Sequence, residues 1–256
     1  MWKFLCKSDQ NDSELGLSKK QKAIADREQE LLFIAKELVE EHGFHNFTMD
    51  KLTAQSAYSK GTIYNHFSSK EDVFTALCTL SLRYQMSLFK RAMQFEGNSR
   101  EKGLALHVAY VMSAKVEPTL FNCILVSKTP WVMQKTSPDR LQKQAELEQE
   151  CSAMIDSMFS VALATGDLKI NAAVGIDGLA FSNWAITFGS IALISSASNC
   201  HSIDRVRDHN MFLFNINTLL DGLGWQPLSD SFDYQRTWKK VEETIFAEEL
   251  ELLSKI

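Results

Sequence analysis

Residues 59–67, SKGTIYNHF, carry side chains suited to contact nucleic acid. Ile63 and Phe67 are spaced i and i+4, so one face of a short helix would pack into a core. The side chains that remain on the other faces are basic, hydroxyl or amide, namely Lys60, Thr62, Asn65 and His66. Groups of this kind bind phosphate oxygens and base edges in a DNA major groove.

A second short helix is predicted just before this one. Thr48 can cap it, and Asp50 in its first turn complements the helix dipole. Small residues around Ser56 and Ala57 form a turn, and Ser59 can then cap the helix that carries Ile63. This order predicts a helix-turn-helix.

The elements that must position this motif can be predicted on both sides of it. An apolar stripe indicates a core-facing helix that ends at Gly43 and contains Leu31, Ile34, Ala35, Leu38 and Val39. The small core would be closed by Phe44, Phe47, Met49, Leu52, Ile63 and Phe67. On the other side, Ser68 to Glu71 fits the capping box S-x-x-E and opens a connector helix that runs to about Phe95. A tilt at its far end would move the helix-turn-helix.

The composition favours an all-α protein. With 4 prolines and 11 glycines in 256 residues, long helices are possible. The net charge of -5 excludes a chain covered with positive charge, but a DNA-binding protein needs only a local basic face. Residues 58–70 contain two lysines and no acid, a modest charge that suggests two copies are needed for useful affinity.

The remaining helices are predicted from apolar periodicity and from helix breakers. Loops are expected at 97–99, at Pro130-Trp131 and around 199–202, and helices at 100–116, 138–166, after 171, 204–223 and 231–256. The stretch 178–200 has no charge and is long enough to cross a membrane. Its repeated serine, asparagine and threonine residues favour an interface helix instead, and no membrane partner is expected. Together with the helix over 204–223 it favours a homodimer, the alternative being a simple core.

Catalytic and metal sites are not expected. The chain has no G-x-S-x-G, H-E-x-x-H, phosphate loop or compact carboxylate pair, so we predict no enzyme, metal or cofactor. The cysteines are odd in number and scattered, namely Cys6, Cys78, Cys123, Cys151 and Cys200. They indicate reduced thiols in the cytoplasm, with redox sensing as the alternative.

The segment SKGTIYNHF followed by SKED resembles the signature of the TetR/AcrR family of one-component transcriptional regulators. The resemblance is specific in this N-terminal part and only architectural afterwards. It implies an all-α homodimer with an N-terminal three-helix DNA-binding domain, a connector helix and a larger helical domain for a small molecule and dimerisation. The expected boundaries are a mobile arm at 1–18, the DNA-binding domain at 19–70, the ligand-binding and dimerisation domain at 71–228, and a helical extension at 229–256.

The resemblance also implies the DNA contacts. Tyr64, His66 and Lys70 would hold the DNA backbone, and residues 59–62 would face base edges. The full expected set is Thr48, Tyr58, Ser59, Lys60, Gly61, Thr62, Tyr64, Asn65, His66 and Lys70. The family usually has glycine and a small apolar residue in the turn, where this chain has Ala57 and Tyr58. We therefore expect a reshaped turn, in which Tyr58 displaces the usual core side chain toward the groove.

An effector site is expected among aromatic, methionine and polar residues of the middle helices. The candidates are His107, Tyr110, Met112, Phe121, Trp131, Met154, Met158, Asn183, Trp184 and Phe188. Residues of these types are more often simple core. As a set they suggest an apolar or aromatic effector, oriented by His107 and Asn183.

The function expected from these observations is a ligand-responsive homodimeric regulator, chiefly a repressor, that binds a palindromic double-stranded DNA operator. Two alternatives remain. One is a TetR-like scaffold that acts through protein contacts of its C-terminal helix and altered turn, and the other, ranked last, is a helical enzyme acting on a lipid-like substrate.

Overall fold

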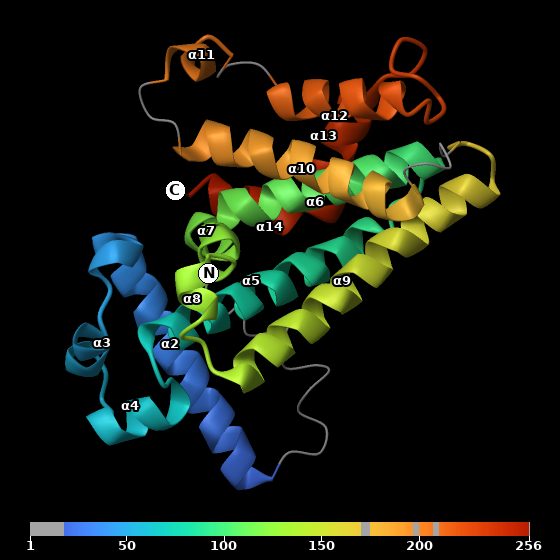
Figure 1. The fold of residues 1–256 in the computed structure, drawn as a ribbon. Helices are drawn as coiled ribbons and strands as arrows, with labels where there is room; N and C mark the ends of the chain where they lie inside the picture. The colour runs from blue at the N-terminus through green and yellow to red at the C-terminus, as the bar shows by residue number, and fades with distance from the viewer. Residues whose placement is uncertain (1–17, 170–174, 197–199, 207–209, 256) are drawn as a thin grey trace. The chain divides into compact units, whose positions relative to one another are not determined.

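The computed structural model describes residues 18–169, 175–196, 200–206 and 210–255. Within these ranges every regular element is a helix, which confirms the all-α prediction (Figure 1). The expected mobile arm lies outside them, apart from Ser18. The helices are α2 (Lys19–Asn46), α3 (Met49–Gln55), α4 (Lys60–His66), α5 (Lys70–Ala92), α6 (Ser99–Val116), α7 (Pro118–Ser127), α8 (Pro130–Met133), α9 (Pro138–Ala164), α10 (Gly175–Ser196), α11 (His201–Asp204), α12 (Met211–Gly222), α13 (Tyr234–Ile245) and α14 (Ala247–Leu253).

The chain divides into two compact units. We call residues 1–87 and 117–149 the head unit, and residues 88–116 and 150–256 the body unit. Helices α5 and α9 each begin in the head unit and continue into the body unit. The functional boundaries expected from the sequence stay a prediction.

The head unit has the predicted small core. Phe47, Leu52, Ile63 and Phe67 are fully buried, and Met49 is nearly so. Gly43 has a φ of 76°, the left-handed region that glycine enters without steric cost. Phe44 follows it and packs edge-on against the ring of Phe74, with the centroids 5.5 Å apart.

The start of α5 differs from the prediction by one residue. Because the helix begins at Lys70, its N-cap is Ser69, whose Oγ accepts a hydrogen bond from the backbone N of Asp72 at 3.1 Å. The carboxylate of Asp72 accepts from the backbone N and the Oγ of Ser68 at 2.8 and 2.6 Å. The predicted box from Ser68 to Glu71 is therefore wrong, since Asp72 at the third helical position reaches back instead.

Asp72 also holds the start of α9. Its other carboxylate oxygen accepts from the backbone N of Ser137 at 2.7 Å, and the side chain is almost fully buried. Burial by itself would raise the pKa of Asp72, but the hydrogen bonds from Ser137 and Ser68 lower it below its usual value. The ionised carboxylate thus joins the first turns of α5 and α9.

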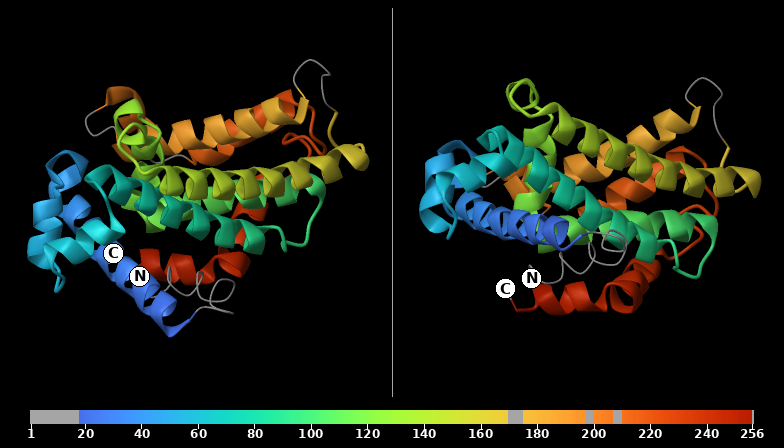
Figure 2. Two further views of the ribbon diagram at one scale, coloured as in Figure 1. Left: turned by 60° about the horizontal axis from the view of Figure 1, so that its bottom comes forward. Right: turned by 90° about the horizontal axis from the view of Figure 1, so that it is seen from below.

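In the body unit, α10 and α12 lie side by side and α10 also packs against α6 (Figure 1). Helices α13 and α14 pack along α6, and Figure 2 presents the same elements from two further directions. The tail predicted as one helix is two, separated at the fully buried Phe246. The helix predicted over 204–223 begins only at Met211, and the expected loop at Pro130-Trp131 contains the short helix α8.

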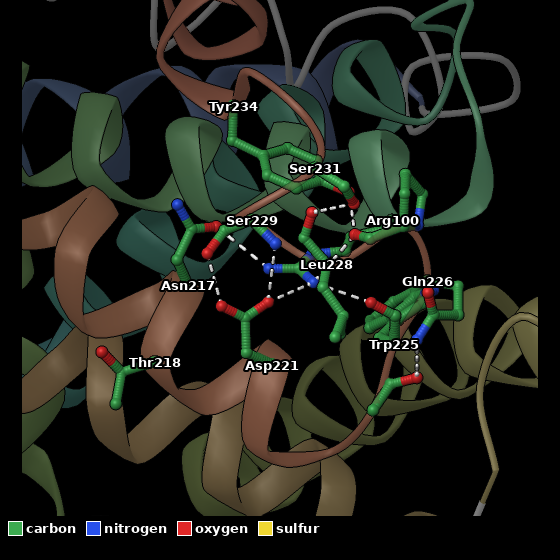
Figure 3. Close-up of polar contacts among 12 residues, drawn as sticks. Arg100, Asn217, Thr218, Asp221, Trp225, Gln226, Leu228, Ser229, Ser231 and Tyr234 are labelled. Atoms are coloured by element: carbon green, nitrogen blue, oxygen red, sulfur yellow. Dashed lines mark hydrogen bonds and ion pairs between the residues drawn. The ribbon is translucent and has the colours of Figure 1, made fainter.

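Arg100 ties the tail into the body unit. Figure 3 shows its guanidinium, which is fully buried, among groups from α12, from the following loop and from α13. It donates to Asp221 Oδ1 at 2.6 Å, Trp225 O at 2.7 Å, Pro227 O at 3.0 Å and Asn217 Oδ1 at 3.2 Å, and it lies 4.4 Å from the ring centroid of Tyr234. Since a buried charge must be paired and hydrogen-bonded, these contacts hold α6, α12 and α13 together. The tail is therefore part of the body unit, and the alternative of a scaffold that acts through protein contacts stays a prediction.

Candidate functional site

The two helices of the motif begin where the sequence predicts. Thr48 Oγ1 accepts from the backbone N of Lys51 at 3.2 Å and caps α3. Ser59 Oγ accepts from the backbone N of Thr62, also at 3.2 Å, and caps α4. Each cap satisfies a backbone donor at the start of its helix, so both ends are held by local bonds.

Most of the expected DNA-contact residues lie on exposed positions of α4 and its flanks. Ile63 and Phe67 face the core, so the opposite side of α4 is left toward solvent. The exposed members are Thr48, Ser59, Lys60, Gly61, Tyr64 and Asn65, and the half-buried ones are Tyr58, Thr62, His66 and Lys70. This face is where phosphate and base-edge donors are available.

The turn before α4 is built around Ser56 and Tyr58. Ser56 Oγ accepts from the backbone N of Tyr58 at 3.3 Å and so closes the turn. The Tyr58 hydroxyl donates to Glu30 Oε2 at 2.5 Å, and its ring lies 5.4 Å from the guanidinium carbon of Arg27. Tyr58 thus contacts α2, and its expected contact with DNA stays a prediction.

The lysine of α4 also faces an acid. Lys60 Nζ lies 2.9 Å from Asp50 Oδ1, and 5.8 Å from the ring centroid of Tyr64. The hydrogen bond to Asp50 raises the pKa of Lys60 above its usual value. The lysine is therefore charged at neutral pH and already has a carboxylate partner.

His66 and Lys70 have neighbours within the head unit. The side chain of His66 is only 6% exposed, and its Nδ1 lies 3.5 Å from Glu28 Oε2. A phosphate contact by this ring stays a prediction and would require the ring to turn outward. Lys70 Nζ lies 5.9 Å above the ring of Trp131, a residue expected in the effector site.

Arg140 is a head-unit residue that the sequence did not single out. It lies in the first turn of α9, and its Nη2 donates to the carbonyl oxygen of His66, the last residue of α4, at 2.7 Å. Its Nη1 donates to Glu28 Oε1 at 3.0 Å, and the guanidinium lies 4.6 Å from the ring centroid of Phe67. An arginine at a helix C-terminus complements the helix dipole, so Arg140 fixes this end of α4. No local motif marks it, because its partners are far away in sequence.

The two polar residues expected to orient an effector contact each other. In the body unit, His107 Nε2 lies 2.9 Å from Asn183 Oδ1, and its Nδ1 lies 2.6 Å from Thr187 Oγ1. All three side chains are buried. Burial lowers the pKa of His107 to about 4, although the Asn183 hydrogen bond opposes this shift. The ring is neutral at pH 7, with both nitrogens satisfied.

The other expected effector residues lie in both units. In the body unit, Trp184 Nε1 donates to the hydroxyl of Tyr110 at 3.0 Å, and the Trp184 ring lies 5.7 Å from that of Phe188. Met154 and Met158 are half-buried on α9, and Met112 is fully buried. Phe121 and Trp131 belong to the head unit. These contacts join His107 with Asn183, and they join Trp184 with Tyr110 and Phe188. A single effector site lined by all of these residues stays a prediction.

Helix α10 buries several polar side chains and exposes several large apolar ones. Its buried residues include Asn183, Thr187 and Ser190. Its exposed residues include Phe181, Trp184 and Leu193, which are 65%, 44% and 58% exposed, and on α12 Phe214 is 62% exposed. By length and composition Gly175–Ser195 could cross a membrane, the one such helix among the described residues, and 28% of its apolar window is buried. Single exposed apolar residues are common on protein surfaces, but several of them on one helix indicate a surface that another molecule covers.

Two of the described thiols, those of Cys78 and Cys123, are not activated. Cys78 and Cys123 are buried, and burial raises the pKa of Cys78 to about 11 and that of Cys123 well above its usual value. Thiolate is the reactive form, so neither group is a ready nucleophile. Cys6 lies outside the described residues.

Residues 31–77 match the family model described as bacterial regulatory proteins, tetR family. The chain is 24% identical over 141 residues to the fatty acid metabolism regulator protein of Bacillus subtilis (strain 168), a match that covers 55% of this chain and 70% of that protein.

Solved structures share the fold. A TetR-family transcriptional regulator from Syntrophomonas wolfei superposes with a TM-score of 0.59 and 18% identity, over 80% of this chain and 97% of that one. The ketosteroid transcriptional regulator KstR2 of Mycobacterium tuberculosis superposes with a TM-score of 0.54 and 16% identity, over 77% of this chain and 94% of that one.

Proposed function

Because this chain is a TetR-family transcriptional regulator, we propose that it is a homodimeric repressor released from a palindromic operator by a small apolar or aromatic effector. The observation that carries the proposal is the exposed donor face of α4, within the segment that matches the family model. Two copies would place their α4 helices in adjacent major grooves, about 34 Å apart along DNA.

The outward apolar side of α10 and α12 supports the homodimer. Phe181, Leu193 and Phe214 are each more than half exposed, and a second copy would remove them from water. A two-fold axis pairs identical surfaces, so one apolar patch serves both chains. The same contact would cover α10 without a membrane, in keeping with a cytoplasmic regulator.

The aromatic and methionine residues of the body unit support an apolar effector. Trp184 contacts both Tyr110 and Phe188, and it directly follows Asn183, the partner of His107, in the sequence. Two similar proteins are a fatty acid metabolism regulator and a ketosteroid transcriptional regulator, which favours a lipid-like or polycyclic ligand for this chain. Binding would stabilise a conformation in which α5 and α9 hold the two α4 helices at the wrong separation.

A DNA-binding titration tests the proposal. Fluorescence anisotropy should be measured with duplexes from the DNA that flanks the protein's own gene and with random duplex at the same salt. The affinity for the flanking DNA should be at least about 1,000-fold higher, which is the lower end of the ratios found for sequence-specific proteins. Equal affinity for both DNAs would refute an operator-binding function. Addition of a long-chain fatty acid or a steroid should release the protein, and no release by either would refute a lipid-like effector.

A further inference from the structure

Three donors of the candidate DNA surface lie beside carboxylates of the same head unit. Lys60 faces Asp50 of α3, and Tyr58 donates to Glu30 of α2. His66 lies beside Glu28, also on α2. A carboxylate offers the same charged oxygen acceptors as a phosphate, so these acids compete with DNA for the same donors.

Asp50 is the acid most directly placed for this competition. It lies two residues after Thr48, itself an expected phosphate ligand, and its side chain is 80% exposed. Lys60, its partner at 2.9 Å, is 62% exposed, so the pair is a surface one that DNA can reach. Exposed pairs contribute little to folding, and removing the carboxylate leaves no buried group unsatisfied.

We propose that Asp50 limits DNA affinity by holding Lys60 in a pair that must be broken before Lys60 can contact a phosphate. This inference rests on the proposed DNA-binding function. Non-specific binding depends almost entirely on unpaired cations near phosphates, whereas operator binding adds contacts to base edges. A pair that occupies Lys60 therefore weakens binding to any DNA on which this lysine contacts a phosphate, random DNA included.

The test compares Asp50→Asn with the unaltered protein on a random-sequence 30-bp duplex and on duplexes that the unaltered protein enriches from a randomised pool. The variant should bind random DNA about fourfold more tightly for each head, the effect of one unit charge about 5 Å from a phosphate in water. The salt dependence of random-DNA binding should steepen by about 0.9 for each head.

Two controls separate the role of Asp50 from a general charge effect. Glu37→Gln removes the same charge from an exposed position of α2 and should leave random-DNA affinity within twofold. When Lys60 is also replaced by Met, Asp50→Asn should no longer give most of its increase in affinity for random DNA. Equal gains from both acid substitutions, a gain that persists without Lys60, or weaker binding by Asp50→Asn would each overturn the proposal.

The proposed function can fail separately from this inference. If the unaltered protein enriches no duplex from the pool, operator binding itself is refuted. If it enriches a duplex and Asp50→Asn leaves the affinity for random DNA unchanged, only the role of Asp50 is refuted. A thermal unfolding curve for each variant establishes that it is folded at the temperature of the titration.

Discussion

Arg140 Nη2 donates to the carbonyl oxygen of His66 at 2.7 Å, so the first turn of α9 holds the last residue of α4. The same guanidinium pairs with Glu28 of α2 and covers the ring of Phe67. Helix α9 continues from this point into the body unit. One side chain thus connects the candidate recognition helix to an element that leaves the head unit.

Arg140→Met should destabilise the protein and weaken DNA binding. It removes hydrogen bonds from a mostly buried charged group, each worth about 1.5–3 kcal/mol, and leaves the end of α4 less fixed. Urea unfolding measures the first effect, and amide exchange in residues 60–67 measures the second. Arg140→Lys keeps the charge without the planar fork and should be intermediate. Exchange rates unchanged by Arg140→Met would contradict this role.

The buried pair of Lys36 and Glu117 should contribute strongly to the head unit. Their side chains approach to 3.0 Å, and both residues are buried. Lys36→Met leaves the Glu117 carboxylate buried without its cation, which should cost about 3–5 kcal/mol in denaturant unfolding at pH 7.5. Adding Glu117→Leu should restore much of the loss, and a double variant as unstable as Lys36→Met would count against the explanation.

The loss in Lys36→Met should depend on pH. Burial raises the pKa of Glu117 above its usual 4.5, and Lys36 opposes this shift, so the pKa should rise further in the variant. A carboxyl with a raised folded-state pKa binds its proton more tightly in the folded state, and the stability this proton provides is lost as the pH rises through that pKa. Unfolding at pH 4.5 and pH 8 should therefore show the larger deficit at pH 8.

His107 should make the body unit sensitive to acid. Burial lowers its pKa from 6.5 to about 4, so the unfolded chain binds a proton that the folded chain excludes. The neutral ring stabilises the fold at neutral pH, and this contribution should fall by about 2 kcal/mol between pH 7 and pH 5. His107→Gln should flatten the dependence of the urea midpoint over this range. An equally steep dependence in the variant would assign the acid loss to other groups.

Gly61→Ala should separate DNA binding from folding. A Cβ at this position on α4 would meet only Ser59 Oγ, at an ordinary 3.9 Å, and alanine favours a helix by up to about 1 kcal/mol. Stability should therefore hold or rise. If the backbone of Gly61 approaches DNA as expected, anisotropy should show a loss of about tenfold or more in affinity for the enriched duplex. Full affinity would remove Gly61 from the contact set.

Phe181→Glu should disrupt the proposed homodimer. The side chain is 65% exposed on the apolar side of α10, so a charge there is harmless in one chain but costly when a second copy covers it. Light scattering after size exclusion should report a dimer for the unaltered protein and a monomer for the variant. Glu150→Gln, an exposed change on α9, is the control and should leave the mass unchanged. A dimeric Phe181→Glu protein would place the interface elsewhere.

Local spacing in the sequence determined the two short helices α3 and α4 of the head unit. Thr48 and Ser59 cap helices through bonds to residues three positions away, and Ile63 and Phe67 share a face, so both features can be predicted without knowing the rest of the fold. The capping box at α5 was misplaced by one residue. Ser68 and Ser69 offer the same chemistry, and only the hydrogen bonds to Asp72 distinguish them.

Tertiary structure alone decided which groups meet across long sequence separations. Arg140 with His66, Lys36 with Glu117, and His107 with Asn183 lie 74, 81 and 76 residues apart. No periodicity links such positions, because their contact depends on how whole helices pack. The sequence therefore determined which side chains were available to α4, while the fold decided that several of them face acids of the same head unit.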